Sequence, residues 1–147
     1  MLEPVFDAAI FQPVFHSYLP LPLFLSTVRA GFPSPASDFT ENSLDLNQFL
    51  VKHPAATFYL KVSGDSMVGA GVYSGDIHIL IVDRAIEAQP GQVVVAVVDG
   101  EFTVKRLCKI KGKFYLSPEN PDYRPLEIKP DMSFAVWGVV TCVLHSV

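Results

Sequence analysis

Ser66 and Lys105 are the side chains of this sequence whose types suggest nucleophilic catalysis. Ser66 stands in the run Gly64-Asp65-Ser66-Met67, directly after an apolar, strand-like segment. A serine on such a turn is exposed, and the backbone N–H groups beside it can stabilise an oxyanion. Glycine, serine and aspartate are turn formers first, however, so a turn that only ends a strand is the simpler interpretation of this run alone.

Lys105 is placed by the clearest local signal in the sequence, the pair Asp99-Gly100 between two apolar runs. This pair predicts a two-residue type I′ hairpin turn. Counting outward from the turn predicts three cross-strand pairs: Val98 with Glu101, Ala96 with Thr103 and Val94 with Lys105. Lys105 would then share a face with apolar neighbours, where desolvation without a carboxylate partner lowers the pKa of the amine. The alternative is a lysine that extends to solvent, as most strand lysines do.

A serine and a lysine with no obvious third partner form a known variant of the serine-histidine-aspartate arrangement. The amine must be neutral to accept the hydroxyl proton, and nearby backbone N–H groups must hold the developing oxyanion. Here the turn would supply the nucleophile and the hairpin would supply the base. The spacing of Ser66 and Lys105 does not by itself establish that they meet.

The elements that must position this pair are mainly strands. Runs rich in β-branched and aromatic residues predict strands over residues 57–62, 77–82, 92–98 and 134–144. One short helix is predicted from Asn42 or Ser43 to His53, with Pro54 after it. Its apolar face would hold Leu46, Phe49 and Leu50. The predicted fold class is mainly β, with one or two short helices.

Residues 1–38 differ from the rest of the chain. They contain six prolines and five phenylalanines and carry almost no charge. Prolines at this density prevent a continuous helix and remove ladder donors, so an extended arm is predicted, followed by a β-rich domain over residues 39–147. Within the arm, residues 27–32 form a proline-free window with small residues at Ala30 and Gly31. This window can lie extended in a groove; an ordinary flexible linker is the alternative.

Composition limits the function further. The chain has 147 residues, half of them hydrophobic, which predicts a single domain with a real core. A formal net charge of -4 argues against a protein that mainly wraps nucleic acid. Five basic residues fall within residues 105–113; a nucleic-acid patch and a solvated strand face are the two interpretations, and the alternation of lysines favours the second.

Neither a cofactor nor a membrane span is expected. The four histidines are scattered without ligand-like spacing, so we infer no metal site. Cys108 and Cys142 lie in apolar runs, which favours buried free thiols in a reducing cytoplasm over a disulfide. The most apolar N-terminal stretch is short and broken by Pro20 and Pro22, and no positively charged signal region precedes it. We therefore expect a cytoplasmic protein.

Four motifs together resemble those of the UmuD proteins, which belong with LexA and phage-type repressors to a family of self-cleaving serine-lysine peptidases. They are AGFPSP at residues 30–35, FYLKVSGDSM at 58–67, SGD at 74–76 and VDGEFTVKRL at 98–107. The resemblance implies the compact peptidase fold of this family. It also implies Ser66 as nucleophile, Lys105 as general base, the backbone N–H groups of Asp65 and Ser66 as oxyanion donors, and self-cleavage between Ala30 and Gly31.

The resemblance implies a biological role as well. In this family a RecA filament on single-stranded DNA stimulates cleavage during the SOS response to DNA damage. The shortened homodimer then joins a UmuC-like Y-family DNA polymerase and permits mutagenic translesion synthesis. No membrane and no direct sequence-specific DNA binding are implied, and cleavage in cis and in trans both stay open.

Two features depart from the family pattern. The stretch over residues 75–82 is two residues longer than usual, which suggests a longer strand or a bulge between the catalytic residues, and the first 22 residues have no recognised counterpart. Three other classes of protein are the alternatives: a signal-peptidase-like enzyme, a binding module without catalysis, and a self-cleaving repressor. The missing membrane anchor, the presence of both Ser66 and Lys105, and the lack of a helix-turn-helix argue against them in that order.

Overall fold

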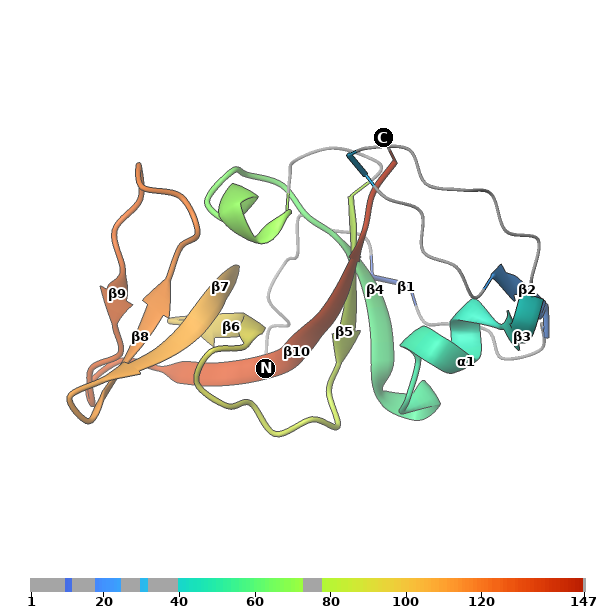
Figure 1. The fold of residues 1–147 in the computed structure, drawn as a ribbon. Coiled ribbons are helices and arrows are strands. Elements are labelled where there is room, and N and C mark those ends of the chain that lie inside the picture. Colours follow the sequence, from blue (N-terminus) through green and yellow to red (C-terminus); the bar gives the residue numbers. More distant parts are fainter. Residues whose placement is uncertain (1–9, 12–17, 25–29, 32–39, 73–77, 147) are drawn as a thin grey trace. The chain divides into compact units, whose positions relative to one another are not determined.

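The computed structural model describes residues 10–11, 18–24, 30–31, 40–72 and 78–146 (Figure 1). The chain divides into two compact units, one formed by residues 14–52 and the other by residues 1–13 and 53–147. Strands dominate both, which confirms the predicted mainly β fold class. The two units are described in turn.

The larger unit is built on one eight-stranded sheet whose neighbouring strands are all antiparallel. The spatial order is β1-β4-β5-β10-β6-β7-β8-β9. The strands are β1 (Ile10–Phe11), β4 (Thr57–Lys61), β5 (Ile79–Asp83), β6 (Val93–Val98), β7 (Glu101–Ile110), β8 (Lys113–Ser117), β9 (Leu126–Glu127) and β10 (Phe134–Leu144). The predicted strands over residues 57–62, 92–98 and 134–144 are confirmed within one residue at each end. The strand predicted from residue 77 is described from Ile79 onward, because residues 73–77 lie outside the described ranges.

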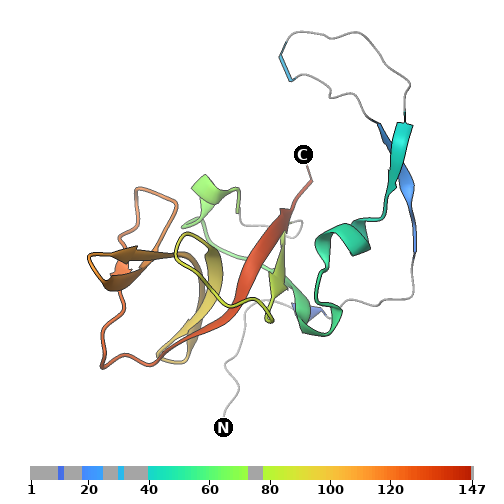
Figure 2. The ribbon, with the colours of Figure 1, turned by 60° about the horizontal axis from the view of Figure 1, so that its bottom comes forward.

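β10 joins the two halves of the sheet. It pairs with β5 on one side and β6 on the other, and its register shifts between Val136 and Gly138 and again between Val140 and Cys142. Figures 1 and 2 show this strand, in red, curving along the sheet. Such irregularities bend a strand and increase its twist. A side chain at Gly138 would not fit, because its Cβ would lie 2.5 Å from Cγ1 of Val82.

The hairpin of β6 and β7 has the predicted register. Val98 lies opposite Glu101, Ala96 opposite Thr103 and Val94 opposite Lys105. At the turn, Asp99 has φ 49° and Gly100 has φ 83°, the two positive angles that a type I′ turn requires. The local signal Asp-Gly was therefore sufficient to place Lys105.

A second hairpin, between β7 and β8, departs from the prediction. The alternation in the sequence predicts one outward strand face for Lys109, Lys111 and Lys113, but Lys111 and Gly112 form a turn with φ 50° and 79°. Ile110, at the end of β7, is 56% exposed, so the expected alternation of buried and exposed residues is wrong here. The lysines themselves are exposed, as predicted for a solvated surface.

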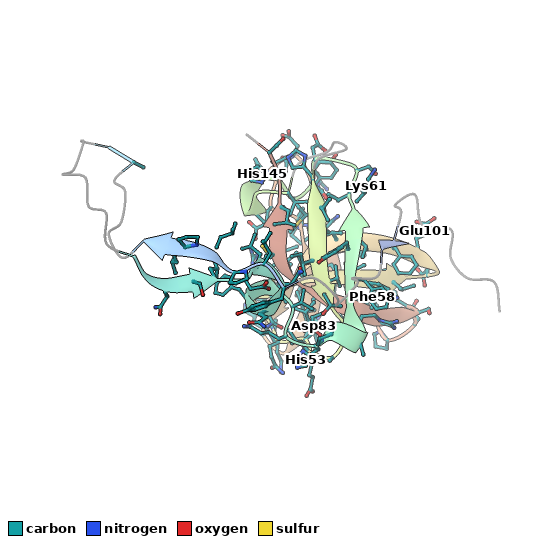
Figure 3. The ribbon with its side chains drawn as sticks, turned by 90° about the vertical axis from the view of Figure 1, so that its right-hand side faces the viewer. His53, Phe58, Lys61, Asp83, Glu101 and His145 are labelled. Carbon is teal, nitrogen blue, oxygen red and sulfur yellow. The ribbon has the colours of Figure 1, made fainter. Side chains whose placement is uncertain are left out.

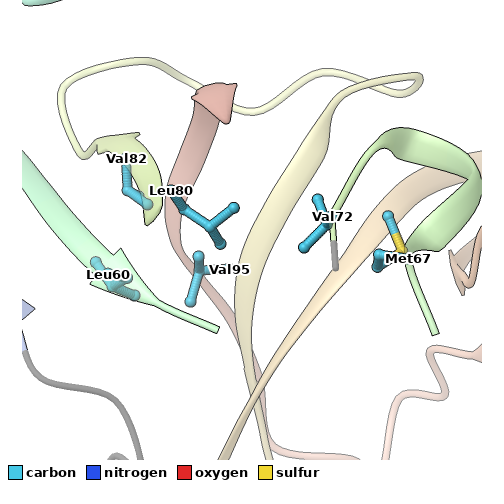
Figure 4. Packing of buried hydrophobic residues seen from close by; sticks show 6 residues of the cluster. All are labelled: Leu60, Met67, Val72, Leu80, Val82 and Val95. Carbon is cyan, nitrogen blue, oxygen red and sulfur yellow. The ribbon is translucent and has the colours of Figure 1, made fainter. Parts of the chain in front are cut away.

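The core lies on both faces of the sheet. One cluster contains Leu60, Met67, Val72, Leu80, Val82 and Val95 (Figure 4). A second cluster contains Val94, Ala96, Leu107, Leu116 and Val139. Successive residues of β6 alternate between the clusters because strand side chains point to opposite faces in turn. Full burial of one such side chain contributes roughly 1.5–3 kcal/mol.

The start of β4 is tied to β5 by a buried carboxylate. Asp83, 3% exposed, accepts hydrogen bonds from the Ala85 N–H at 2.8 Å and is joined to Nδ1 of His53 at 2.6 Å. Figure 3 shows His53 and Asp83 close to each other. The Thr57 hydroxyl donates to the His53 carbonyl at 2.7 Å. A buried carboxylate is tolerated because both of its oxygens have partners.

The smaller unit contains β2 (Leu21–Phe24) paired with β3 (Thr40–Leu44), followed by α1 (Leu46–Leu50). The helix begins at Leu46, so the predicted start at Asn42 or Ser43 is wrong; those residues belong to β3. Asp45 is the N-cap, because its side chain accepts from the Gln48 N–H at 2.9 Å and also from the Leu19 N–H at 2.6 Å. The predicted apolar face is also wrong: Leu46 and Phe49 are 58% and 57% exposed.

Candidate active site

Ser66 lies on a turn between Gly64 and the buried side chain of Met67. β4 ends at Lys61, and Gly64 in the following bend has φ 95°, an angle that glycine adopts without strain. Beyond Ser66, Met67 is 2% exposed and packs in the first core cluster. A short 3₁₀-helix, η2 (Val68–Ala70), follows and ends at Gly71. The serine thus lies between a glycine with positive φ and a buried methionine, and it is half-buried rather than exposed as the sequence predicted.

Lys105 reaches this turn from the middle of β7. Its Nζ donates hydrogen bonds to Ser66 Oγ at 2.9 Å, to Thr103 Oγ1 at 2.9 Å and to the Val104 carbonyl at 3.1 Å. The structure therefore brings together the two side chains that the sequence singled out. Burial lowers the pKa of the Lys105 amine below its usual value, because a charged ammonium loses hydration there. This is the direction that the apolar hairpin face predicted.

A hollow of about 170 Å³ opens beside the pair. Its wall is mixed in character. The polar side chains are those of Lys61, Ser63, Ser66, Thr103 and Lys105, and the apolar residues are Leu60, Val62, Met67, Val72, Leu80, Val95, Phe102 and Val104. A second hollow of about 450 Å³ is also lined by Phe102, Thr103 and Lys105. Walls that combine apolar residues with convergent polar groups are typical of binding sites.

The backbone N–H groups of Asp65 and Ser66 donate no hydrogen bond within the described part of the chain, whereas both carbonyls accept hydrogen bonds. The Ser66 carbonyl accepts from the Glu119 N–H at 2.8 Å. The Asp65 carbonyl accepts from the Asn120 side chain at 2.8 Å and from the Val68 N–H at 3.4 Å. Their role as oxyanion donors stays a prediction.

The residues that hold the turn come from the loop between β8 and β9, on the same side of the sheet as η2 (Figure 1). The Gly69 N–H donates to the Glu119 carbonyl at 2.7 Å, and a Cβ at Gly69 would lie 2.6 Å from that oxygen. Tyr123 donates its hydroxyl hydrogen bond to the Asp65 carboxylate. Arg106, next to Lys105 on β7, pairs with the Glu119 carboxylate.

Thr103 is a site residue whose position the sequence did signal. It lies two residues before Lys105, on the same face of β7, where alternate side chains point the same way. Its contact with the Lys105 amine follows from that spacing. The loop residues Glu119, Asn120 and Tyr123 gave no comparable signal, since they meet the turn only through long-range folding.

Ala30 and Gly31 belong to the other compact unit, where both are exposed and lie in a bend. Cleavage between them stays a prediction. The apparent two-residue insertion over residues 75–82 lies partly outside the described residues; from Ile79 onward that segment forms regular β5.

The remaining titratable groups form no metal centre within the described ranges, where no three His, Cys, Asp or Glu side chains gather as ligands. Cys108 and Cys142 are free, as predicted, but half-buried rather than buried. None of the helices among the described residues is long and apolar enough to cross a membrane.

Comparison with known proteins gives a consistent result. The model of the Peptidase S24-like family matches residues 22–141. Protein ImpA of Salmonella typhimurium is 48% identical over 126 residues, covering 84% of this chain and 83% of that protein. Protein SamA of Salmonella typhimurium strain LT2 is 47% identical over 124 residues, with 84% of each chain covered. LexA repressor 2 of Xanthomonas oryzae pv. oryzae is 40% identical over 138 residues, 94% of this chain and 63% of the repressor.

Proposed function

Because the chain belongs to the S24-like peptidase family, with the UmuD-like and LexA proteins, we propose that it is a serine peptidase that cleaves its own N-terminal arm. The observation that carries the proposal is the 2.9 Å contact between Lys105 Nζ and Ser66 Oγ beside a hollow of about 170 Å³. Residues 39–147 would be the peptidase domain, and residues 1–38 would be the arm that contains the cleaved bond.

In the proposed reaction, neutral Lys105 takes the hydroxyl proton of Ser66 while Oγ attacks the carbonyl carbon of Ala30. The N–H groups of Asp65 and Ser66 hold the oxyanion of the tetrahedral intermediate. When the intermediate collapses, the bond to the Gly31 nitrogen breaks and Lys105 gives its proton to the leaving amine. Water, deprotonated by the same lysine, then hydrolyses the ester at Ser66 and releases residues 1–30 with a new carboxylate.

The sizes of the residues at the proposed cleavage site support this assignment. Ala30 has a side chain small enough for a restricted hollow, and Gly31 lets the backbone approach the nucleophile closely. Both are exposed in the structure, as a bond that must enter an active site has to be. Cleavage in cis and in trans are both compatible with the reaction, since the chemistry is the same in either case.

The biological role follows from the family. The protein would act in the cytoplasm during the SOS response, where a RecA filament on single-stranded DNA stimulates its cleavage. The shortened homodimer would serve a UmuC-like Y-family polymerase as accessory subunit in error-prone translesion synthesis. The UmuD-like motifs and the relatives ImpA and SamA, at 47–48% identity, support this role.

The test is to incubate the purified full-length chain at rising pH and to sequence the N-terminus of the large fragment. The expected fragment begins Gly31-Phe32-Pro33-Ser34. The Ser66→Ala variant should stay intact under the same conditions. A fragment with another N-terminus would contradict the cleavage site, and cleavage of Ser66→Ala at the wild-type rate would contradict the nucleophile.

A further inference from the structure

We propose that Asn120 and Tyr123, from the loop between β8 and β9, are positioning residues that orient the oxyanion-binding peptide groups of the Ser66 turn. The inference rests on the proposed self-cleavage, because it assigns further residues to that reaction. It concerns side chains that lie 55 and 58 residues away from the turn in sequence and touch it directly in the structure.

The Asn120 amide is held in one orientation. Its Oδ1 accepts a hydrogen bond from the Asp122 N–H at 3.0 Å, an Asx turn within the loop. Because the oxygen is used in this way, the nitrogen is the group that faces the turn, and Nδ2 donates to the Asp65 carbonyl at 2.8 Å. The side chain therefore has two separate roles: its oxygen stabilises the conformation of the loop, and its nitrogen forms a hydrogen bond with the Ser66 turn.

The bond to the Asp65 carbonyl acts on the Ser66 N–H. These two groups belong to one planar trans peptide unit and point in opposite directions. A donor that fixes the carbonyl on one side consequently aims the N–H at the other side, where the oxyanion would form. A hydrogen bond to the carbonyl also polarises the peptide and strengthens its N–H as a donor.

The neighbouring groups of the turn are fixed from the same loop. The Glu119 N–H donates to the Ser66 carbonyl at 2.8 Å, which holds the next peptide plane. Tyr123 donates to the Asp65 carboxylate. That hydrogen bond and the negative charge of Asp65 raise the pKa of Tyr123, which keeps its phenol a donor at mildly alkaline pH. Three contacts from this loop, made by Glu119, Asn120 and Tyr123, thus hold Asp65 and Ser66, the two residues proposed as oxyanion donors.

The decisive variant is Asn120→Asp, assayed as self-cleavage of the full-length chain. Aspartate keeps the oxygen that accepts from the Asp122 N–H, so the loop turn is preserved, but it replaces the donor that faces the Asp65 carbonyl by an acceptor. Loss of a direct oxyanion donor costs roughly 100-fold or more in rate, so loss of a residue that orients one is expected to cost about 10-fold. The loss should be seen on the high-pH plateau, where Lys105 is neutral in every variant.

The second variant is Tyr123→Phe, which changes no charge. Its expected loss is about 3-fold, the effect of one exposed hydrogen bond, with the midpoint of the pH-rate profile unchanged. Tyr115→Phe is the matched control: Tyr115 lies on β8, and no hydrogen bond of its hydroxyl is recorded within the described residues. It should cleave at the wild-type rate.

The outcomes separate this inference from the function on which it rests. If the wild-type chain does not cleave, or Ser66→Ala does, the proposed function fails. If wild type cleaves normally and Asn120→Asp and Tyr123→Phe match it, only the positioning role is overturned. A displaced pH midpoint in Tyr123→Phe with an unchanged plateau would also overturn it, since the residue would then act on Lys105. Thermal unfolding of each variant shows that the rates compare folded proteins.

Discussion

Lys105 Nζ lies 2.9 Å from Ser66 Oγ, although 39 residues separate the two in the sequence. The approach depends on a tight hairpin that places Lys105 opposite Val94 and on a turn anchored by buried Met67. The lysine is half-buried, and its pKa is lowered because burial penalises its charge. A base and a hydroxyl are therefore in hydrogen-bond contact, with the base biased toward its reactive neutral form.

The rate of self-cleavage should rise with pH. The reactive form of Lys105 is the neutral amine, so the rate should increase as pH passes through its pKa and then level off. Because burial lowers that pKa, the midpoint should lie below the usual lysine value of 10.5. The measurement is the first-order loss of full-length chain across a pH series. A rate that is flat or that falls as pH rises would contradict the role of the lysine.

Thr103→Val should slow cleavage without unfolding the protein. The change removes the Oγ1 that lies 2.9 Å from Lys105 Nζ and leaves the amine less well oriented. One such hydrogen bond is worth about 1 kcal/mol, which corresponds to roughly a 5-fold loss of rate. Thr141→Val on β10 is the matched control, since the Thr141 hydroxyl bonds only to the Ile81 carbonyl among the described residues. Equal rates for the two variants would show that Thr103 has no role in orienting the amine.

Gly69→Ala should impair the Ser66 turn. An added Cβ would meet the Glu119 carbonyl oxygen at 2.6 Å and push away the loop that holds the turn. A misplacement of about 1 Å in an active site can cost about 100-fold in rate. Gly138→Ala is the control, because its Cβ would be equally crowded, 2.5 Å from Val82 Cγ1.

The two glycine variants are compared by cleavage rate below their melting temperatures. Both variants should be less stable than wild type. Only Gly69→Ala should show a loss of cleavage rate larger than its loss of stability explains. If Gly138→Ala loses as much, the effect belongs to general destabilisation and not to the turn.

Leu80→Ala should destabilise the fold. Leu80 is fully buried in the first core cluster, and its truncation leaves a cavity at a cost of about 2–5 kcal/mol. Leu126→Ala, at a residue 43% exposed on β9, should change the free energy of unfolding by about 0.5 kcal/mol or less. Urea unfolding of both variants measures the difference. Similar changes in the free energy of unfolding for the two variants would mean that Leu80 does not contribute to the stability of the core.

What the sequence predicted was local in origin. The Asp99-Gly100 turn set the β6–β7 register, and through it the position of Lys105 and Thr103. Runs of β-branched and aromatic residues predicted the positions of β4 and β10, because such residues favour strands. These signals depend on neighbours in sequence, and the structure confirms them.

What the sequence missed has two causes. Asn120 and Tyr123 contact Asp65 across more than fifty residues, and no local pattern encodes such a contact. The helix was placed too early because Asn42 and Ser43 are good caps in general, whereas pairing with β2 draws them into β3 and leaves Asp45 to cap. In both cases tertiary contacts outweighed local preference.

The most direct test of the central claim is the self-cleavage rate of Lys105→Ala beside the wild-type chain at alkaline pH. The account predicts that wild type yields the fragment beginning at Gly31, while Lys105→Ala stays intact although it is folded. Truncating a half-buried lysine should not unfold the sheet, and far-ultraviolet circular dichroism checks this. If Lys105→Ala releases the same fragment at the wild-type rate, Lys105 is not the base.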